Sequence, residues 1–148
     1  MDTVCSIQAH NREYGETEET SRANVEEALE LIPPIEKAAY LEAMQVAPRL
    51  VETETNPLVF LRYENFNCWN TACRIVSYWE ERKRVFGEKA FLPLALVGES
   101  ALSEEAVRAI HAGFAFGLPN DSEGRSVLYY DISIIKDLPT QVRIQILF

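Results

Sequence analysis

Ser100, His111 and Asp131 are the side-chain types of a hydrolase triad, in which a histidine takes the proton of a serine hydroxyl. The serine of such a triad usually sits on a sharp turn between a strand and a helix, and nothing around Ser100 predicts that turn. The chain also lacks the GxSxG, GxGxxG and GxxxxGK[ST] motifs of hydrolases and of dinucleotide- and nucleotide-binding proteins. We therefore expect no catalytic residue and no enzyme, and interpret His111 as a surface or hydrogen-bonded imidazole.

Metal ligation is not expected either. The three cysteines have neither CxxC spacing nor a histidine pair to complete a zinc site. On a helix, Cys68 and Cys73 would lie about 140° apart around the axis, so we expect free thiols rather than a disulfide. The acidic turn at residues 119–124 has its glycine at the wrong position for an EF-hand loop. No metal or cofactor is predicted.

Aromatic residues form two groups of different meaning. Trp69 and Trp79 fall on the apolar stripe of a helix expected over residues 68–86, so we interpret both as core residues. Tyr129 and Tyr130 are adjacent in a segment expected to be a strand, where neighbouring side chains point to opposite faces. One of the two must face any cavity beside the sheet, which makes both candidate ligand contacts.

The front of the chain predicts short helices. Ser21 is expected to cap the first helix and Pro33-Pro34 to end it. The expected core positions of this helix are Val25, Ala28, Leu29 and Ile32. A second helix is expected over residues 35–46, with core positions Ala38, Ala39, Leu41 and Met44. Residues 51–57 are expected to be a linker, followed by a short helix over residues 58–63 that is buried on more than one side.

Residues 68–86 give the strongest helix signal, with Asn67 as cap, Gly87 as end and a solvated charged stretch at residues 80–84. Its expected apolar stripe is Trp69, Ala72, Ile75, Val76, Trp79 and Phe86. Ser103 is expected to start a helix that runs to about His111.

The back of the chain predicts a turn and a strand. Residues 119–124 are typical of a turn, and residues 125–135 predict a strand whose unbroken apolar run is typical of coverage on both faces. We favour a helix over a strand for residues 141–148.

Composition excludes several classes of partner. A formal charge of −9 and a pI near 4.7 disfavour nucleic acid, whose binding needs clustered lysine and arginine. The apolar content of 47% suffices for one core. The first residues do not form a signal peptide, and the longest apolar run, residues 90–98, is too short to span a bilayer. We expect a soluble cytoplasmic protein.

Two separated segments together resemble the Sec14-like (CRAL-TRIO) family. Residues 56–87 resemble its pattern of FLR, then phenylalanine, then a long helix with tryptophan, carried by Phe60, Leu61, Arg62, Phe66, Ala72 and Trp79. Residues 118–131 resemble its D-x-x-G-R turn before the first strand of the lipid-binding domain, carried by Asp121, Gly124, Arg125, Val127 and Tyr129. The resemblance covers about half of the chain.

The resemblance implies an α/β fold that is mostly helical in the part present, with the first strand or strands of an incomplete sheet. It implies a disordered acidic tail over residues 1–20, a helical region over 21–100, and the start of a truncated lipid-binding domain over 101–148. The implied function is non-enzymatic binding of a hydrophobic lipid and its transfer between membranes, with transient membrane contact and with Tyr129 and Tyr130 as lipid contacts.

Two departures from the family pattern shape the expectation. Glu64 stands where phosphoinositide-binding members commonly have a basic residue, so phosphoinositide recognition is not expected. Ser126 replaces the usual proline after the Gly-Arg pair. The family's pocket floor and gating helix lie downstream of Phe148, so a fragment or a degenerate copy that binds no lipid is an alternative. A helical protein–protein interaction module, docking through an exposed apolar C-terminal segment, is another.

Overall fold

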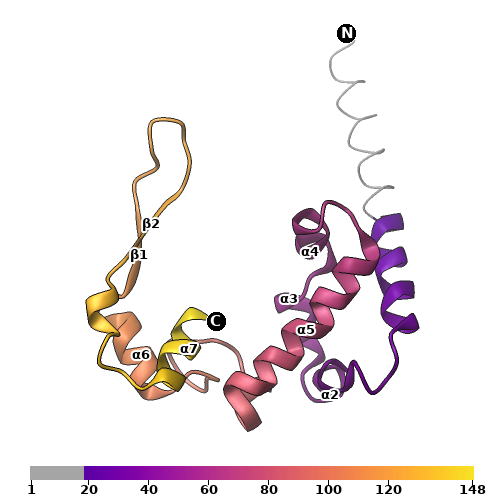
Figure 1. Cartoon of the computed structure of the whole chain (residues 1–148), viewed down its shortest axis with the longest axis horizontal. Helices are drawn as coiled ribbons and strands as arrows, with labels where there is room; N and C mark the ends of the chain where they lie inside the picture. Colours follow the sequence, from indigo (N-terminus) through magenta and orange to yellow (C-terminus); the bar gives the residue numbers. More distant parts are fainter. Residues whose placement is uncertain (1–18) are drawn as a thin grey trace. The chain divides into compact units, whose positions relative to one another are not determined.

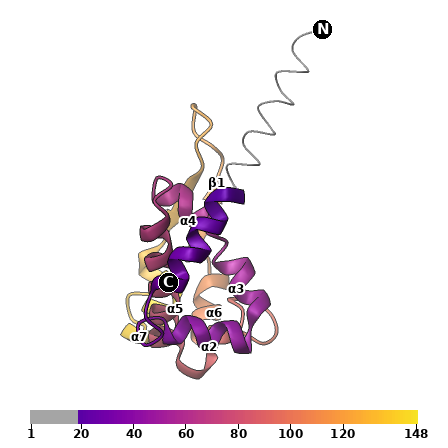
Figure 2. The ribbon, with the colours of Figure 1, turned by 90° about the vertical axis from the view of Figure 1, so that its right-hand side faces the viewer.

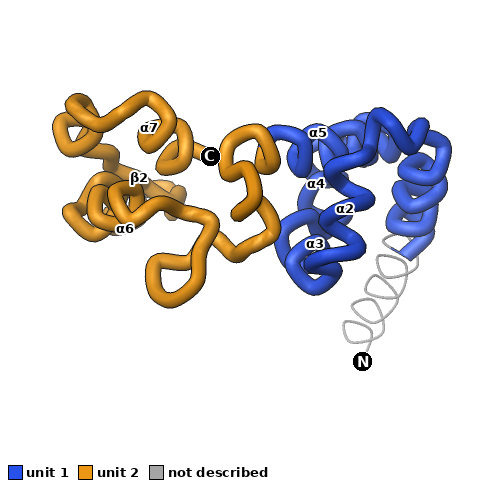
Figure 3. The backbone as a smooth tube through the Cα atoms, turned by 90° about the horizontal axis from the view of Figure 1, so that it is seen from below, with its two compact units in different colours: residues 1–81 blue, residues 82–148 orange. Residues whose placement is uncertain are grey.

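The computed structural model describes residues 19–148, and they are mostly helical with one small antiparallel sheet (Figure 1). The expected acidic tail lies outside the described residues except for residues 19 and 20, which are helical. The chain divides into two compact units, with unit 1 ending at Glu81 and unit 2 beginning at Arg82 (Figure 3). This boundary falls within a helix, whereas the sequence placed its division at residues 100 and 101.

The first helix of unit 1 covers residues 19–31 and buries the four expected core positions. It begins before Ser21, so the prediction that Ser21 is its cap was wrong. The helix ends before Pro33-Pro34, as expected, because proline lacks the N–H that would continue it. Lys37 then donates hydrogen bonds to the carbonyl groups of Leu29 and Glu30 and so satisfies the last turn. Figures 1 and 2 both show this helix running beside α5.

Helix α2 (Ala38–Val46) and helix α3 (Pro48–Glu54) follow. The expected linker over residues 51–57 was wrong for residues 51–54, because Pro48 starts α3 at its first turn, where a missing N–H costs nothing. Ala43 is the buried residue of α2. Ala38, Leu41 and Met44 are exposed, so the predicted core face of α2 was also wrong.

Helix α4 (Pro57–Tyr63) starts as predicted, because Asn56 accepts a hydrogen bond from the Leu58 N–H at 3.1 Å. Leu61 is its buried residue, while Val59 is largely exposed, so burial on more than one side was wrong. After α4 the backbone turns through Asn65 and Phe66, which both have positive φ.

Helix α5 (Cys68–Phe86) is capped by Asn67, whose side chain accepts from the Asn70 N–H at 3.0 Å, and it is followed by Gly87 at φ +58°. The predicted stripe is buried with one exception, since Trp69 is half-exposed. Trp79 is fully buried and donates to the Thr55 hydroxyl at 3.3 Å. This bond ties α5 to the turn between α3 and α4.

Arg82 corrects the prediction that the charged end of α5 is a solvated face, because its side chain is fully buried. The guanidinium donates from Nε to the Ala90 carbonyl at 2.6 Å and from Nη2 to the Leu92 carbonyl at 2.5 Å. Both acceptors belong to the 3₁₀ helix η1 (Gly87–Phe91) or to the residue after it. Arg82 thus fixes the chain where it leaves α5.

The core of unit 2 joins η1 to helix α6 (Glu104–His111) and helix α7 (Thr140–Leu147). Ser103 caps α6 as predicted, accepting from the Ala106 N–H at 3.2 Å. The helix predicted over residues 141–148 is confirmed as α7. The buried residues of this core are Val85, Phe86, Ala90, Ala101, Leu102, Ala106 and Val142. Partly buried residues of α7 also pack against it, so the C-terminal segment is not the exposed apolar element that the interaction-module alternative assumed.

The sheet is a hairpin of β1 (Ala115–Leu118) and β2 (Val127–Tyr130), followed by the 3₁₀ helix η2 (Ile132–Ile134). Strand β2 was predicted, but as part of a longer strand covered on both faces. The observed strand has four residues and most of its side chains are exposed, so full coverage was wrong for the described residues. The unbroken apolar run reflects two open faces of the hairpin.

Candidate functional site

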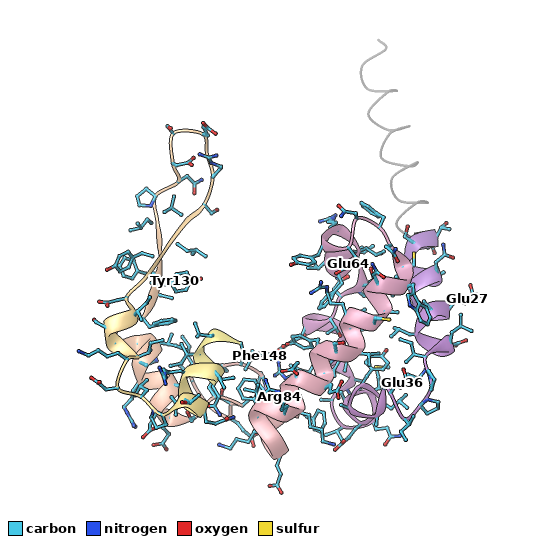
Figure 4. All side chains as sticks on the ribbon, viewed as in Figure 1. Glu27, Glu36, Glu64, Arg84, Tyr130 and Phe148 are labelled. Carbon is cyan, nitrogen blue, oxygen red and sulfur yellow. The ribbon has the colours of Figure 1, made fainter. Side chains whose placement is uncertain are left out.

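The hairpin carries the predicted ligand contacts, and its register sorts their side chains onto two faces. Phe116 pairs with Tyr129, and Ala115 pairs with Tyr130. Directly opposed residues share a face and successive residues alternate. One face, called here the Phe116 face, therefore carries Phe116, Leu118, Val127 and Tyr129. The opposite face carries Ala115, Gly117, Leu128 and Tyr130. Figure 4 draws side chains on both sides of this ribbon.

Ring contacts distinguish the two tyrosines. The Phe116 and Tyr129 rings have centroids 4.9 Å apart and form an exposed aromatic pair. The Tyr130 ring instead lies 5.6 Å from Phe114, which is buried in a cluster with Ala109 and Ile135. Tyr130 thus leans on the core of unit 2, while Tyr129 belongs to the more open Phe116 face.

Both tyrosines remain available for contact, with exposed fractions of 45% for Tyr129 and 51% for Tyr130. Leu128 and Phe116 are exposed to similar degrees. A two-stranded hairpin is marginally stable alone, and a sheet normally buries at least one apolar face. The hairpin therefore offers apolar surface that a ligand or another chain segment would cover favourably.

The loop between the strands is organised by Asp121. Its Oδ1 accepts from the backbone N–H groups of Glu123 and Arg125, both at 2.9 Å, and its Oδ2 pairs with the Arg125 Nε at 2.6 Å. Gly124 completes the turn at φ +78°, donating to the Asp121 carbonyl. The Arg125 N–H and guanidinium hold the pKa of Asp121 below its ordinary value. The D-x-x-G-R residues thus shape the turn before β2.

The possible triad is not assembled. The Ser100 hydroxyl accepts from the N–H groups of Ala95 and Leu102 and donates to the Pro93 carbonyl. Asp131 accepts from the N–H and the hydroxyl of Ser133. His111 is exposed at the end of α6. Each residue has a local structural role in place of a shared proton path.

Cys68 and Cys73 are free thiols in the structure, as geometry predicted. Among the described residues, no group of three histidine, cysteine, aspartate or glutamate side chains is arranged to hold a metal ion. Glu64 pairs with the Arg74 guanidinium, so its carboxylate is engaged within unit 1.

Two hollows elsewhere have mixed linings. In unit 2, a hollow of about 560 Å³ lies between η1 and α6 and includes Lys89, Glu99 and Arg108. In unit 1, a hollow of about 320 Å³ includes Arg22, Glu26 and Tyr40, where burial and then the Glu26 charge raise the pKa of the tyrosine. Neither lining includes a hairpin residue. The hairpin is the most apolar candidate site because its exposed faces carry no charged side chain.

Comparison with protein-family models, curated proteins and solved structures found no match. None of the helices within residues 19–148 combines the length and the apolar character needed to cross a bilayer. The chemistry of the chain therefore has to be argued from its own residues.

Sequence reasoning missed strand β1 and the buried Arg82. Gly113 and Gly117 indicated a loose chain, but Gly117 lies within β1 opposite Leu128. The available signal for β1 was the alternation of Phe114, Phe116 and Leu118 with small residues. No local signal marked Arg82, because its acceptors lie in the segment that follows α5.

Proposed function

We propose that this chain is part of a Sec14-like α/β protein that binds a hydrophobic lipid and transfers it between membranes without catalysis. The observation that carries the proposal is the Phe116 face, which exposes Phe116, Leu118 and Tyr129 directly after a D-x-x-G-R turn. The turn and strand occur in the order that the family resemblance implies. The absence of an assembled triad or metal cluster among the described residues fits a binding protein better than an enzyme.

Apolar burial supplies the driving force for this binding. Each square ångström of apolar surface removed from water contributes roughly 25 cal/mol, and an acyl chain or ring system laid on the Phe116 face would cover several large side chains at once. Tyr129 also carries a hydroxyl that can bond to a polar end of the ligand. Tyr129 is therefore the residue that we assign to ligand contact, and Tyr130 is assigned to the support of the hairpin through Phe114.

The test is lipid extraction by the natural protein at the length at which cells make it. The protein is incubated with phosphatidylcholine vesicles, separated from them, and its bound lipid is extracted and identified. Tyr129→Asp on the Phe116 face should abolish the bound lipid. Leu128→Asp is the matched control, because it places the same charge one residue away on the opposite face. A wild-type protein that carries no lipid, or equal loss in both variants, contradicts the proposal.

A second candidate function is strand addition by a partner protein. Within the described residues the sheet has two strands, so each strand has one edge without a neighbouring strand. Such an edge can take up an extended segment through backbone hydrogen bonds. A chain that remains monomeric at high concentration and binds no hydrophobic dye would count against this function.

A further inference from the structure

The turn that joins α4 to α5 exposes three aromatic side chains within seven residues. The exposed fractions are 71% for Tyr63, 55% for Phe66 and 50% for Trp69. These three residues are called here the α4–α5 corner, and Glu64, which lies among them in sequence, marks its place in Figure 4. Burying such rings is normally among the strongest contributions to a core. Their exposure within so short a segment points to a contact surface.

The backbone of the corner holds Phe66 in a costly conformation. Asn65 and Phe66 have φ of +52° and +62°, a region that a bulky side chain seldom adopts. The Phe66 N–H bonds to the Leu61 carbonyl at 2.7 Å and closes the end of α4.

The end of α6 uses the same hydrogen-bonding pattern with a different result. The Phe114 N–H bonds to the Ala109 carbonyl at 3.3 Å, and glycine occupies position 113 at φ +92°. Phe114 is buried, with 3% of its surface exposed, whereas Phe66 in the matching position is exposed. The helix ending therefore does not require an exposed ring, and the strain at Phe66 marks a site of use.

Charge identifies the kind of surface that the corner fits. Residues 62–74 contain two arginines and one glutamate, a formal charge of +1 in a chain of −9. Arg74 pairs with Glu64, and its guanidinium lies 4.3 Å from the centre of the Tyr63 ring. The negative charge that would keep this protein from phosphate headgroups is thus absent from the corner. Tryptophan and tyrosine beside polar residues are typical of the boundary between water and lipid.

We propose that the α4–α5 corner docks on the surface of a phosphatidylcholine bilayer, with Phe66 and Trp69 entering the interface. This inference rests on the proposed lipid-transfer function and names its membrane-contacting surface. The corner lies within unit 1, and the ligand-binding hairpin lies within unit 2. Membrane contact and ligand capture are therefore separable by mutation.

The two tryptophans allow a direct test, because the chain has no others. Phosphatidylcholine vesicles with brominated acyl chains are titrated into the protein while its tryptophan fluorescence is recorded. Docking should quench the emission of Trp69, which is exposed, and spare that of the fully buried Trp79. The quenching should vanish in Trp69→Phe. An absence of quenching in the wild-type chain, or quenching that persists in Trp69→Phe, overturns the proposal.

Vesicle sedimentation supplies the second measurement. Phe66→Asp should weaken binding by at least about tenfold, since it removes the ring and adds a charge. Val46→Asp is the matched control on α2, where the replaced side chain is just as exposed, and it should leave binding unchanged. Equal losses in the two variants overturn the proposal. So does a Phe66-dependent dimer that binds no vesicle, because it assigns the corner to protein contact.

The two proposals fail in different ways. Vesicle binding that needs Phe66, without any lipid extraction, keeps the corner as a membrane site and removes the carrier function. Lipid extraction that proceeds equally in Phe66→Asp keeps the carrier function and removes the corner.

Discussion

Phe116 and Tyr129 oppose each other across the hairpin, with ring centroids 4.9 Å apart and ring planes inclined by 40°. This pair is the principal side-chain contact of the Phe116 face. The opposite pair of Gly117 and Leu128 has no corresponding contact, because glycine has no side chain. The hairpin is consequently held more strongly from one face than from the other.

Phe116→Ala should therefore loosen the hairpin by about 0.5–1 kcal/mol, the usual value of an aromatic cross-strand pair. Amide hydrogen exchange of residues 115–118 and 127–130 measures the change. Leu128→Ala is the control and should accelerate exchange less. Equal acceleration in both variants would show that the ring pair does not stabilise the hairpin.

The loop at Asp121 should respond to acid. Because the folded pKa of Asp121 is below its ordinary value of 3.8, its contribution to stability is present above that value. The contribution is lost as the pH falls through the lower folded pKa. NMR titration of the Glu123 and Arg125 N–H groups follows the two hydrogen bonds directly. Asp121→Asn should remove the titration, and shifts that persist in this variant would assign them to another group.

Arg82 should be the most sensitive charged residue of unit 2. Arg82→Ala leaves the Ala90 and Leu92 carbonyl groups without their donor and should lower the free energy of unfolding by about 3 kcal/mol. Arg84→Ala, two positions away and exposed, should change it by less than about 0.5 kcal/mol. Urea unfolding followed by circular dichroism measures both values. Similar values for the two variants would refute a structural role for burial of Arg82.

The strain at Phe66 predicts that a glycine there is stabilising. Phe66→Gly should raise the free energy of unfolding by about 1 kcal/mol, because glycine accepts positive φ without steric cost and the lost ring is exposed. Gly87→Ala is the reverse test at φ +58°, where an added Cβ meets no other atom, and should lower it by a similar amount. A destabilised Phe66→Gly would mean that the ring contributes packing that outweighs the strain.

Helices and their ends were largely predictable because their signals are local. Asn56, Asn67 and Ser103 were identified as caps or helix starts from the sequence, and each accepts the expected backbone hydrogen bond. Pro33-Pro34 and Gly87 likewise ended helices where backbone geometry requires it. Errors arose where tertiary packing decides, as at Trp69, whose position on the stripe gave no sign of its exposure.

The candidate site was predicted only in part, for a similar reason. Tyr129 and Tyr130 were assigned to opposite faces from the two-residue period of a strand, and the register confirms that separation. The partner strand could not be inferred with confidence in its pairing, because Gly117 weakens the strand pattern of β1. The contact of Tyr130 with Phe114 depends on that pairing, so the different roles of the two tyrosines emerge from the structure alone.

The central claim is that the Phe116 face binds one hydrophobic lipid, and native mass spectrometry tests it most directly. The natural protein is incubated with phosphatidylcholine vesicles, recovered from them and weighed intact. The account predicts a mass increase equal to one lipid molecule, retained in Leu128→Asp and lost in Tyr129→Asp. A folded wild-type protein whose mass remains that of the bare polypeptide would contradict it.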